Sequence, residues 1–289
     1  MTSMAHTPET MADTPSCIET PSGKNAGTEN FPVGSWLIRP DLRVHVHAFY
    51  RFARAADDIS DNPLLDPDQK LTALLRFKAV LDGTDDAAVP AAMEMRASLT
   101  QSGVSAKHCH DLLTAFCRDA TQLRYRDWND LLDYCRYSAA PVGRYVLALH
   151  GIGETAWPTN DALCAALQII NHIQDCADDY RELDRVYIPD DMLAAHGAHI
   201  AMLAAARSPA PLRAVLDAML DRMEPMMREA RALPRHVPDL RLKLETAVIA
   251  SLADSLIDLL HRRDPLADNV KLSKARTIWA ALRGCCRIW

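Results

Sequence analysis

The chain contains 289 residues, of which 49% are hydrophobic, and carries a formal net charge of −6 at pH 7. It is long enough for a substantial core, and the absence of a basic domain argues against nucleic acid as a partner. Its eight cysteines show no CxxC spacing, so we expect reduced cytosolic thiols rather than a zinc site or a disulfide framework. No run of 18 uncharged apolar residues occurs, so no membrane-spanning helix is predicted.

Residues 1–29 differ in composition from the rest of the chain. They are rich in Thr, Pro, Ser and Glu, a composition that predicts a disordered tail. They also lack the apolar segment of a secretory signal. From residue 30 onward, apolar residues recur at helical spacing, with no strand pattern and no fixed repeat. We therefore expect one all-α domain over residues 30–289. Its helices are expected at residues 40–61, 67–81, from 90 onward, 105–116, 127–151, 159–183, 211–232, 240–262 and 271–289.

The first expected helix carries an acidic face within residues 50–61, which read YRFARAADDISD. Four polar side chains stand at i, i+4, i+7 and i+11, on one side of a helix: Tyr50, Arg54, Asp57 and Asp61. Asp58 lies off that side. Two carboxylates one turn apart can share a divalent cation through oxygen, the ligand that Mg²⁺ prefers. Taken alone, the pattern fits a solvated acidic turn equally well.

The segment 127–151 has helical periodicity but contains a proline. Pro141 removes a backbone hydrogen bond and kinks the helix. The residues before it, Ser138, Ala139 and Ala140, are all small. The kink is either a packing feature or the wall of a space for a slender apolar ligand, and both interpretations stay open.

A second oxygen-rich face follows within residues 168–179, which read QIINHIQDCADD. Its members stand at i, i+3, i+7 and i+11: Gln168, Asn171, Asp175 and Asp179. The helix ends in a polar loop at residues 185–189. Two such faces directed at each other would hold several Mg²⁺ ions and a polyanion between them.

The last stretch, residues 271–289, is basic and amphipathic. It combines cationic with apolar side chains: Lys271, Lys274, Arg276, Arg283 and Arg287 with Leu272, Ile278, Trp279, Leu282 and Trp289. Such a helix either lies on an anionic membrane surface or docks on the core as a terminal helix, and the sequence alone does not decide.

The two acidic faces, set in an apolar helical interior, suit a diphosphate joined to a long hydrocarbon. Bound Mg²⁺ would make the diphosphate a leaving group, and Arg54 would donate hydrogen bonds to its oxygens. Its departure leaves a carbocation, which a water-poor cavity protects. Tyr50 and Tyr134 offer π faces to that cation or hydrogen bonds to the diphosphate.

Three stretches, in order along the chain, carry a resemblance to the squalene/phytoene synthase family. YRFARAADDISD is similar to its first Asp-rich motif and QIINHIQDCADDYRELDRVYIP to its second, and YCRYSAAPVG resembles the kinked-helix motif between them. The similarity extends from residue 30 to the C-terminus. It implies the all-α isoprenoid-synthase fold, a helical bundle around a central cavity, and Mg²⁺-dependent use of prenyl diphosphates.

The resemblance also implies roles for single residues. The metal ligands would be Asp57, Asp61, Asp175 and Asp179. The catalytic side chains would be Tyr50, Arg54, Tyr134 and Asn171. The substrate contacts would come from Phe31, Arg54, Tyr134, Ala139, Val142, Gly143, Gln168, Asn171, Arg185 and Tyr187.

Finer features are most similar to the bacterial hydroxysqualene synthases of hopanoid pathways, notably ENFPVGSW, SAAPVGR and NHIQDCADDY. Such enzymes act on presqualene diphosphate and let water capture the rearranged cation, so NADPH is not expected. The resemblance further implies functional pairing with a presqualene diphosphate synthase and a hydroxysqualene reductase. It implies a cytoplasmic enzyme, peripheral at the inner face of the membrane if the basic C-terminal helix binds lipid.

The chain also departs from commoner family patterns. Residues 27–30 replace a usual His-Ser pair, Gln174 stands where relatives often carry Arg, and Ala140 where they often carry Gly. These departures weaken any inference from enzymes that bind two separate farnesyl diphosphates. The alternatives are a presqualene diphosphate, squalene or phytoene synthase, and a non-catalytic helical assembly factor of the same family. The four intact aspartates argue against the last.

Overall fold

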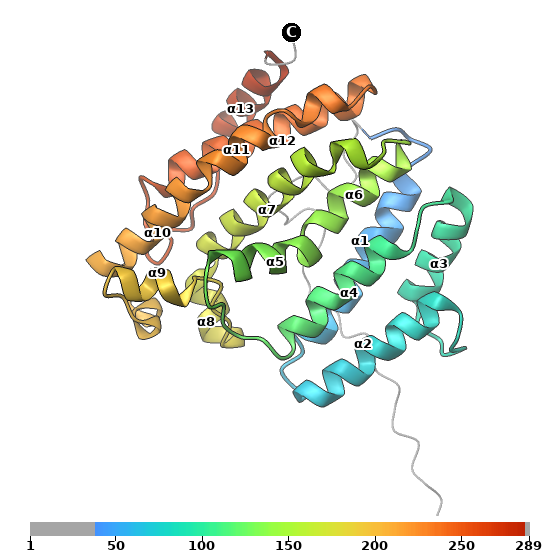
Figure 1. Cartoon of the computed structure of the whole chain (residues 1–289), viewed down its shortest axis with the longest axis horizontal. Coiled ribbons are helices and arrows are strands. Elements are labelled where there is room, and N and C mark those ends of the chain that lie inside the picture. The colour runs from blue at the N-terminus through green and yellow to red at the C-terminus, as the bar shows by residue number, and fades with distance from the viewer. Residues whose placement is uncertain (1–37, 287–289) are drawn as a thin grey trace, which may run out of the picture.

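The computed structural model of the chain describes residues 38–286 and shows an assembly of helices (Figure 1). These residues form thirteen α-helices and three short 3-10 helices, with no β-strand among them, so the all-α expectation is confirmed. The α-helices are α1 (Arg43–Ser60), α2 (Pro67–Asp82), α3 (Pro90–Ser102), α4 (Lys107–Asp119), α5 (Trp128–Ser138), α6 (Ala140–Leu149), α7 (Trp157–Gln174), α8 (Cys176–Leu183), α9 (Asp190–Ala195), α10 (Ala210–Arg222), α11 (Glu224–Ala230), α12 (Leu240–Leu260) and α13 (Lys274–Cys286). The predicted tail and Phe31 lie outside the described residues.

Local sequence signals account for the ends of several helices, and α2 illustrates them. The Asp66 carboxylate accepts a hydrogen bond from the Gln69 amide at 2.9 Å, and the Gln69 side chain accepts one from the Asp66 amide at 3.0 Å. This reciprocal capping box satisfies two amides that the helix itself leaves unpaired. Pro67 occupies the first turn, where its missing N–H costs nothing. Gly83 ends the helix with φ of 74°, in the left-handed region that suits glycine.

The structure corrects several expected boundaries. The first helix begins at Arg43 rather than near Pro40. The expected helices at 127–151, 159–183 and 211–232 are each divided in two, at Ala139, Asp175 and Met223 respectively. The short helix α9 was not expected. At Ala139 the break has the predicted cause, because Pro141 cannot continue the hydrogen-bond ladder of α5.

Two apolar clusters make up the core. The first contains residues of α1 to α4, with Phe52 and Phe77 fully buried. The second is built on α5 to α12 and includes Ile169 and Ile170. Tyr145 of α6 belongs to the first cluster and stacks on Phe49, with ring centroids 4.3 Å apart. The candidate site lies where these clusters face each other.

The C-terminal helix α13 docks along α12 (Figure 1). Gly284 lies so close to α12 that a Cβ atom there would approach the Ala247 carbonyl oxygen to 2.7 Å. The docking expected for a terminal helix is therefore present, but it uses only one face of α13. Ile278, Trp279 and Leu282 remain exposed on the outer side. Within residues 38–286, no helix combines the length and apolarity needed to cross a membrane.

Candidate functional site

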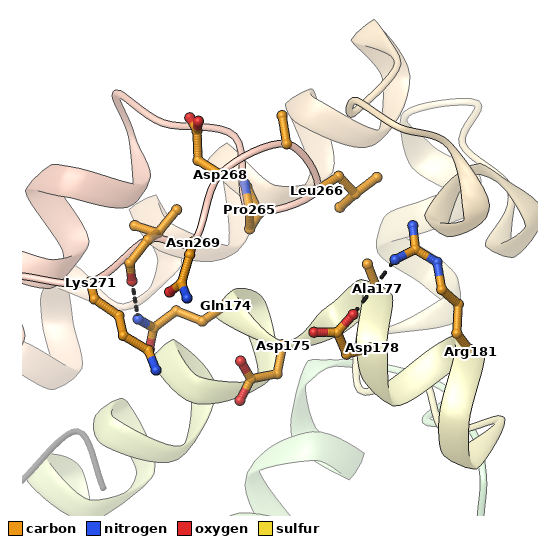
Figure 2. A pocket seen from close by; sticks show the side chains of 12 residues that line it. Gln174, Asp175, Ala177, Asp178, Arg181, Pro265, Leu266, Asp268, Asn269 and Lys271 are labelled. Atoms are coloured by element: carbon orange, nitrogen blue, oxygen red, sulfur yellow. Dashed lines mark hydrogen bonds and ion pairs between the residues drawn. The ribbon is translucent and has the colours of Figure 1, made fainter. Parts of the chain in front are cut away.

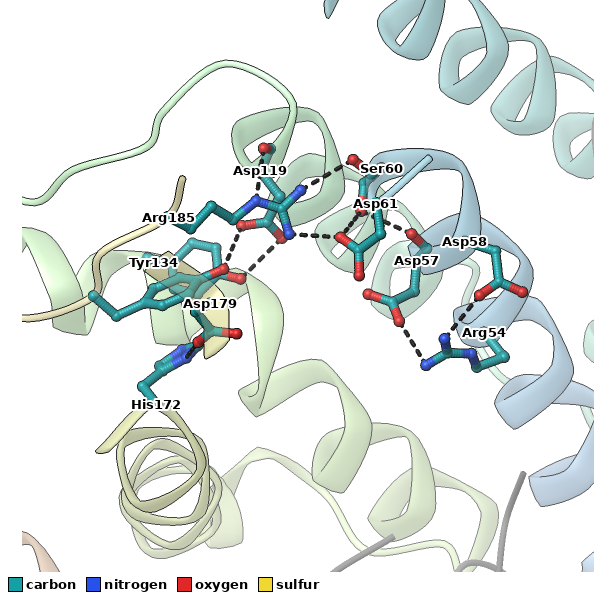
Figure 3. Close-up of polar contacts among 11 residues, drawn as sticks. Arg54, Asp57, Asp58, Ser60, Asp61, Asp119, Tyr134, His172, Asp179 and Arg185 are labelled. Atoms are coloured by element: carbon teal, nitrogen blue, oxygen red, sulfur yellow. Dashed lines mark hydrogen bonds and ion pairs between the residues drawn. The ribbon is translucent and has the colours of Figure 1, made fainter. Parts of the chain in front are cut away.

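The two predicted oxygen-rich faces line one cavity of about 370 Å³, to which α1, α5, α7 and α8 contribute. Figure 3 shows part of its polar wall. Its lining includes most of the predicted site residues: Tyr50, Arg54, Asp57, Asp61, Tyr134, Val142, Gln168, Asn171, Asp175, Asp179, Arg185 and Tyr187. The structure therefore brings both acidic faces together, although more than a hundred residues separate them along the chain.

On the first face, Arg54 pairs with two carboxylates at once. Its guanidinium lies 2.7 Å from Asp57 and 2.8 Å from Asp58, one helical turn away. Asp58, which the sequence pattern placed off the acidic side, is therefore the second partner of Arg54. The guanidinium thus lies beside the predicted metal ligand Asp57, where its donors can also serve phosphate oxygens.

Arg185 connects the two halves of the site and is only 5% exposed. Its guanidinium donates to the Asp61 carboxylate at 2.6 Å and to the carbonyl oxygens of Ser60 at 3.0 Å and Asp119 at 3.1 Å. Ser60 and Asp119 are the last residues of α1 and α4, so one cation satisfies carbonyls at two helix C-termini. Arg185, predicted as a substrate contact, therefore also fixes the orientation of Asp61 (Figure 3).

A loop-to-loop contact on the outer side holds Arg185 in place. The Val186 amide donates to the Leu123 carbonyl at 2.9 Å, and Arg124 pairs with the Asp184 carboxylate at 2.6 Å. Asp184 ends α8 with φ of 51°, a conformation uncommon for residues other than glycine. The ion pair to Arg124 stabilises that turn, from which Arg185 and Tyr187 extend toward the cavity.

Aromatic rings and one buried carboxylate form the wall next to Arg185. The Tyr134 and Tyr187 hydroxyls donate to the Asp119 carboxylate at 2.9 and 3.1 Å. The His172 ring stacks on Tyr187 with centroids 3.5 Å apart. Asp119 and His172 were missed by the sequence analysis. Asp119 follows Arg118 and His172 follows Asn171 in amphipathic helices, a pattern that does not separate site residues from surface residues.

The second face is less enclosed than the first. Asp175 is exposed at the break between α7 and α8, yet the amides of Asp175 and Asp179 keep their helical hydrogen bonds across it, at 2.9 and 2.8 Å. Both carboxylates therefore stay on consecutive turns of one side. The Gln168 side-chain amide lies 3.1 Å from the His172 ring. Burial lowers the pKa of His172 to about 3, so the imidazole is neutral near pH 7.

The chemistry of this donor set fits Mg²⁺ bound jointly by the protein and a phosphate. Among residues 38–286, no three His, Cys, Asp or Glu side chains gather closely enough to hold an ion by themselves. The four aspartates instead form two pairs that line the cavity from different helices. Mg²⁺ is commonly held by one or two carboxylates together with water and substrate phosphates rather than by a complete protein cage.

An apolar cavity of about 370 Å³ adjoins the polar one, and Tyr50, Ala53 and Val142 line both. Its wall contains Gly143, one of the predicted substrate contacts. A Cβ atom at Gly143 would come within 2.1 Å of the Asn160 side-chain oxygen, so glycine allows α6 to approach α7 closely. Gly143 therefore serves both close packing and the cavity. Ala139 is buried at the helix break but lines neither cavity.

A further polar hollow of about 330 Å³ lies on the other side of the α7–α8 break (Figure 2). Its lining includes Gln174, Asp175, Arg181 and the segment 265–271. The Gln174 side-chain amide donates to the Val270 carbonyl and so ties this segment to the break. Gln174, noted in the sequence as a departure from an arginine, thus has a loop-anchoring role.

A sequence profile with the description squalene/phytoene synthase matches residues 24–276 of the chain. The chain belongs to the squalene/phytoene synthase family. The hydroxysqualene synthase of Rhodopseudomonas palustris is 44% identical to this family member, over 92% of this chain and 91% of its own length. That of Sinorhizobium fredii is 46% identical over 85% of this chain and 84% of its own.

Solved structures of the squalene/phytoene synthase family are similar as well. The squalene synthase HpnC from Alicyclobacillus acidocaldarius matches with a TM-score of 0.70 at 30% identity, covering 80% of this chain and 87% of that one. A dehydrosqualene synthase matches with a TM-score of 0.74 at 20% identity, which bears on the fold alone. The isoprenoid-synthase fold expected from the resemblance is confirmed.

Proposed function

We propose that the protein is a hydroxysqualene synthase. In this reaction presqualene diphosphate ionises, the carbocation rearranges, and water captures it to give hydroxysqualene and diphosphate. The observation that carries the proposal is the direct contact between an oxygen-lined cavity and an apolar cavity of similar size. The relatives named hydroxysqualene synthase, which align over nearly the whole chain, support this substrate and product.

Four carboxylates would hold the Mg²⁺ ions in this proposal: Asp57, Asp61, Asp175 and Asp179. When bound, Mg²⁺ supplies Lewis-acid stabilisation of the departing diphosphate. The chain itself adds hydrogen-bond donors to the phosphate oxygens from Arg54, Gln168 and Asn171. No hydride donor takes part, because water ends the reaction.

The hydrocarbon part of the substrate would occupy the apolar cavity. Its wall combines side chains of α1, α6, α7 and α12, including Phe49, Leu163 and Ile249. Such a lining excludes bulk water and so protects a carbocation from premature quenching. The ring of Tyr50, which lines both cavities, and that of Tyr134, which lines the polar one, would offer negative π faces to the cation.

Product analysis tests this assignment, because related enzymes differ in the fate of the same cation. The solved relative HpnC is described as a squalene synthase, whereas the curated relatives are described as hydroxysqualene synthases. Purified protein with Mg²⁺ should convert presqualene diphosphate to hydroxysqualene, independently of NADPH, as measured by gas chromatography–mass spectrometry. NADPH-dependent squalene, or presqualene diphosphate made from farnesyl diphosphate, would assign the protein to one of the alternatives.

We propose two functional partners, which the family resemblance implies. A presqualene diphosphate synthase would supply the fused substrate, and a hydroxysqualene reductase would remove the alcohol. Adding presqualene diphosphate synthase and farnesyl diphosphate to the assay should therefore produce hydroxysqualene. Adding hydroxysqualene reductase with its reductant as well should produce squalene. Accumulation of presqualene diphosphate in the coupled assay would contradict the pairing.

We also propose that α13 attaches the protein to the inner face of the cytoplasmic membrane. Its exposed apolar residues Ile278, Trp279 and Leu282 are accompanied by the exposed cations Lys274 and Arg276. This combination suits an anionic lipid surface. An apolar substrate would also enter the site from such a membrane. Cosedimentation should be stronger with vesicles containing phosphatidylglycerol than with phosphatidylcholine vesicles, and Trp279→Ser should weaken it. Equal recovery with both vesicle types would contradict the proposal.

A further inference from the structure

Asp119, at the end of α4, is a buried carboxylate with no role in the chemistry described so far. It is 5% exposed and lines the polar cavity. Burying a carboxylate is costly unless its oxygens are satisfied. Here the Tyr134 hydroxyl donates to one of its oxygens (Figure 3), and the Tyr187 hydroxyl donates to the other. The carboxylate therefore connects to the cavity through two phenols.

Both phenols are suited to pass a proton on rather than to lose one permanently. Burial and the neighbouring Asp119 charge raise the pKa of Tyr134 and of Tyr187 well above the ordinary tyrosine value. They therefore stay neutral near pH 7. A phenol that donates its hydrogen to a carboxylate keeps lone pairs on the same oxygen, which can accept a hydrogen bond from a water molecule.

We propose that Asp119, acting through these phenols, accepts the proton released when water captures the carbocation, an inference that rests on the proposed hydroxysqualene synthase function. The water oxygen forms the new C–O bond to the cationic carbon. One water proton passes to a phenol oxygen while the phenol's own proton passes to an Asp119 oxygen. The cation and the carboxylate become a neutral alcohol and a carboxylic acid, which returns its proton to solvent after product release.

The surroundings favour Asp119 over other protein groups as the acceptor. Burial raises the pKa of Asp119 to about 6, which is close to the range where a general base works best near neutral pH. The neighbouring imidazole of His172 stacks on the Tyr187 ring and lies 3.1 Å from the Gln168 side-chain amide rather than against a phenol oxygen. The carboxylates of Asp57 and Asp61 are already paired with Arg54 and Arg185. The carboxylates of Asp175 and Asp179, which line the same cavity, and the released diphosphate are the competing bases, and the experiment separates them from Asp119.

The test compares wild type with Asp119→Asn, using presqualene diphosphate and Mg²⁺. Asparagine keeps the volume and one hydrogen-bond acceptor but cannot take the proton. Diphosphate release and hydroxysqualene formation are measured in the same reaction. Wild type should form one alcohol per diphosphate released. In the variant that ratio should fall by about tenfold or more, with hydrocarbons formed by proton loss making up the difference.

A matched control is Asp254→Asn. Asp254 is also a buried carboxylate, paired with Arg231 and Arg283, but it lines neither cavity. This variant should keep the wild-type ratio whatever its thermal stability. The double variant Tyr134→Phe/Tyr187→Phe retains Asp119 but lacks both relays, so its alcohol-to-diphosphate ratio should fall as well. It also provides the test if Asp119→Asn does not fold.

The outcomes separate this inference from the proposed function. If wild type produces no hydroxysqualene, the proposed function fails and the inference fails with it. If wild type produces hydroxysqualene and folded Asp119→Asn keeps the ratio of one, even at lower total turnover, Asp119 only supports the wall and another base takes the proton. An unchanged ratio in the double phenylalanine variant would equally overturn the relay.

Discussion

At the scale of single residues, the predicted metal ligands already have cationic neighbours. Arg54 pairs with Asp57, and Arg185 pairs with Asp61. These ion pairs offset the repulsion between carboxylates that would otherwise face each other across the cavity. A metal ion that takes over a carboxylate would leave guanidinium donors available for the phosphate oxygens. The same residues thus stabilise the free protein and prepare the site for an anionic substrate.

The first prediction concerns the two acidic faces. Asp57→Asn and Asp175→Asn should each abolish Mg²⁺-dependent diphosphate release, because an amide cannot replace a charged ligand for a hard cation. Their thermal unfolding should remain close to that of wild type. Asp178→Asn is the control, since Asp178 is 71% exposed on α8 and does not line the polar cavity. Full turnover in both ligand variants would remove these aspartates from the metal site.

Arg185 makes the second prediction, on stability. Arg185→Met leaves the Asp61 carboxylate and two helix-terminal carbonyls without their shared donor, so the free energy of unfolding should fall by about 3 kcal/mol. Urea unfolding measures the change. Arg181→Met is the matched control, because Arg181 pairs with the exposed Asp178 and such a surface pair contributes about 1 kcal/mol or less. Equal losses of unfolding free energy in both variants would show that the contacts of Arg185 do not stabilise the fold more than a surface ion pair does.

At the scale of elements, the sequence predicted which segments are helical better than it predicted where those helices are interrupted. The break at Ala139 has a local cause in Pro141 and could be anticipated. The break at Asp175 has no proline or glycine beside it, so no local signal revealed it. Periodicity survives this break because the helical hydrogen bonds of Asp175 and Asp179 continue across it. The spacing argument for the second acidic face therefore identified side chains that line one cavity, despite the wrong helix boundary.

The packing of α6 against α7 makes the third prediction. Gly143→Ala places a Cβ atom 2.1 Å from the Asn160 oxygen and 2.7 Å from the Cys164 sulfur. This overpacking should destabilise the protein by about 2 kcal/mol, even though alanine favours a helix more than glycine does. Gly153→Ala, which meets no atom within 4 Å, should be close to neutral. Adding Asn160→Ser to Gly143→Ala should restore part of the loss in thermal unfolding. If Asn160→Ser restores no thermal stability, the contact with Asn160 is not the source of the strain.

At the scale of the whole molecule, the site depends on contacts between distant parts of the chain. Arg185 and Asp61 are 124 residues apart, and Asp119 meets both Tyr134 and Tyr187. Spacing along one helix can identify which side chains share a face, but it cannot show which face meets which. The sequence therefore predicted the four aspartates as members of one site, whereas the position of Asp119 and His172 in the same cavity became visible only in the folded chain. The disorder of residues 1–29, the substrate contact from Phe31 and the helix over the last three residues concern parts of the chain outside residues 38–286, so they stay predictions.

The division of the carboxylates between two sides of the cavity makes the last prediction. Because no three ligating side chains gather within residues 38–286, Mg²⁺ alone should bind weakly, and diphosphate alone should be repelled by the aspartates. Together they complete each other's coordination, so preformed magnesium diphosphate should bind at least about tenfold more tightly than either component. Isothermal titration calorimetry measures all three, with the double variant Asp57→Asn/Asp175→Asn as control. Tight binding of Mg²⁺ by itself would mean that the helices move to form a complete protein site, and the reliance on substrate phosphate would then be wrong.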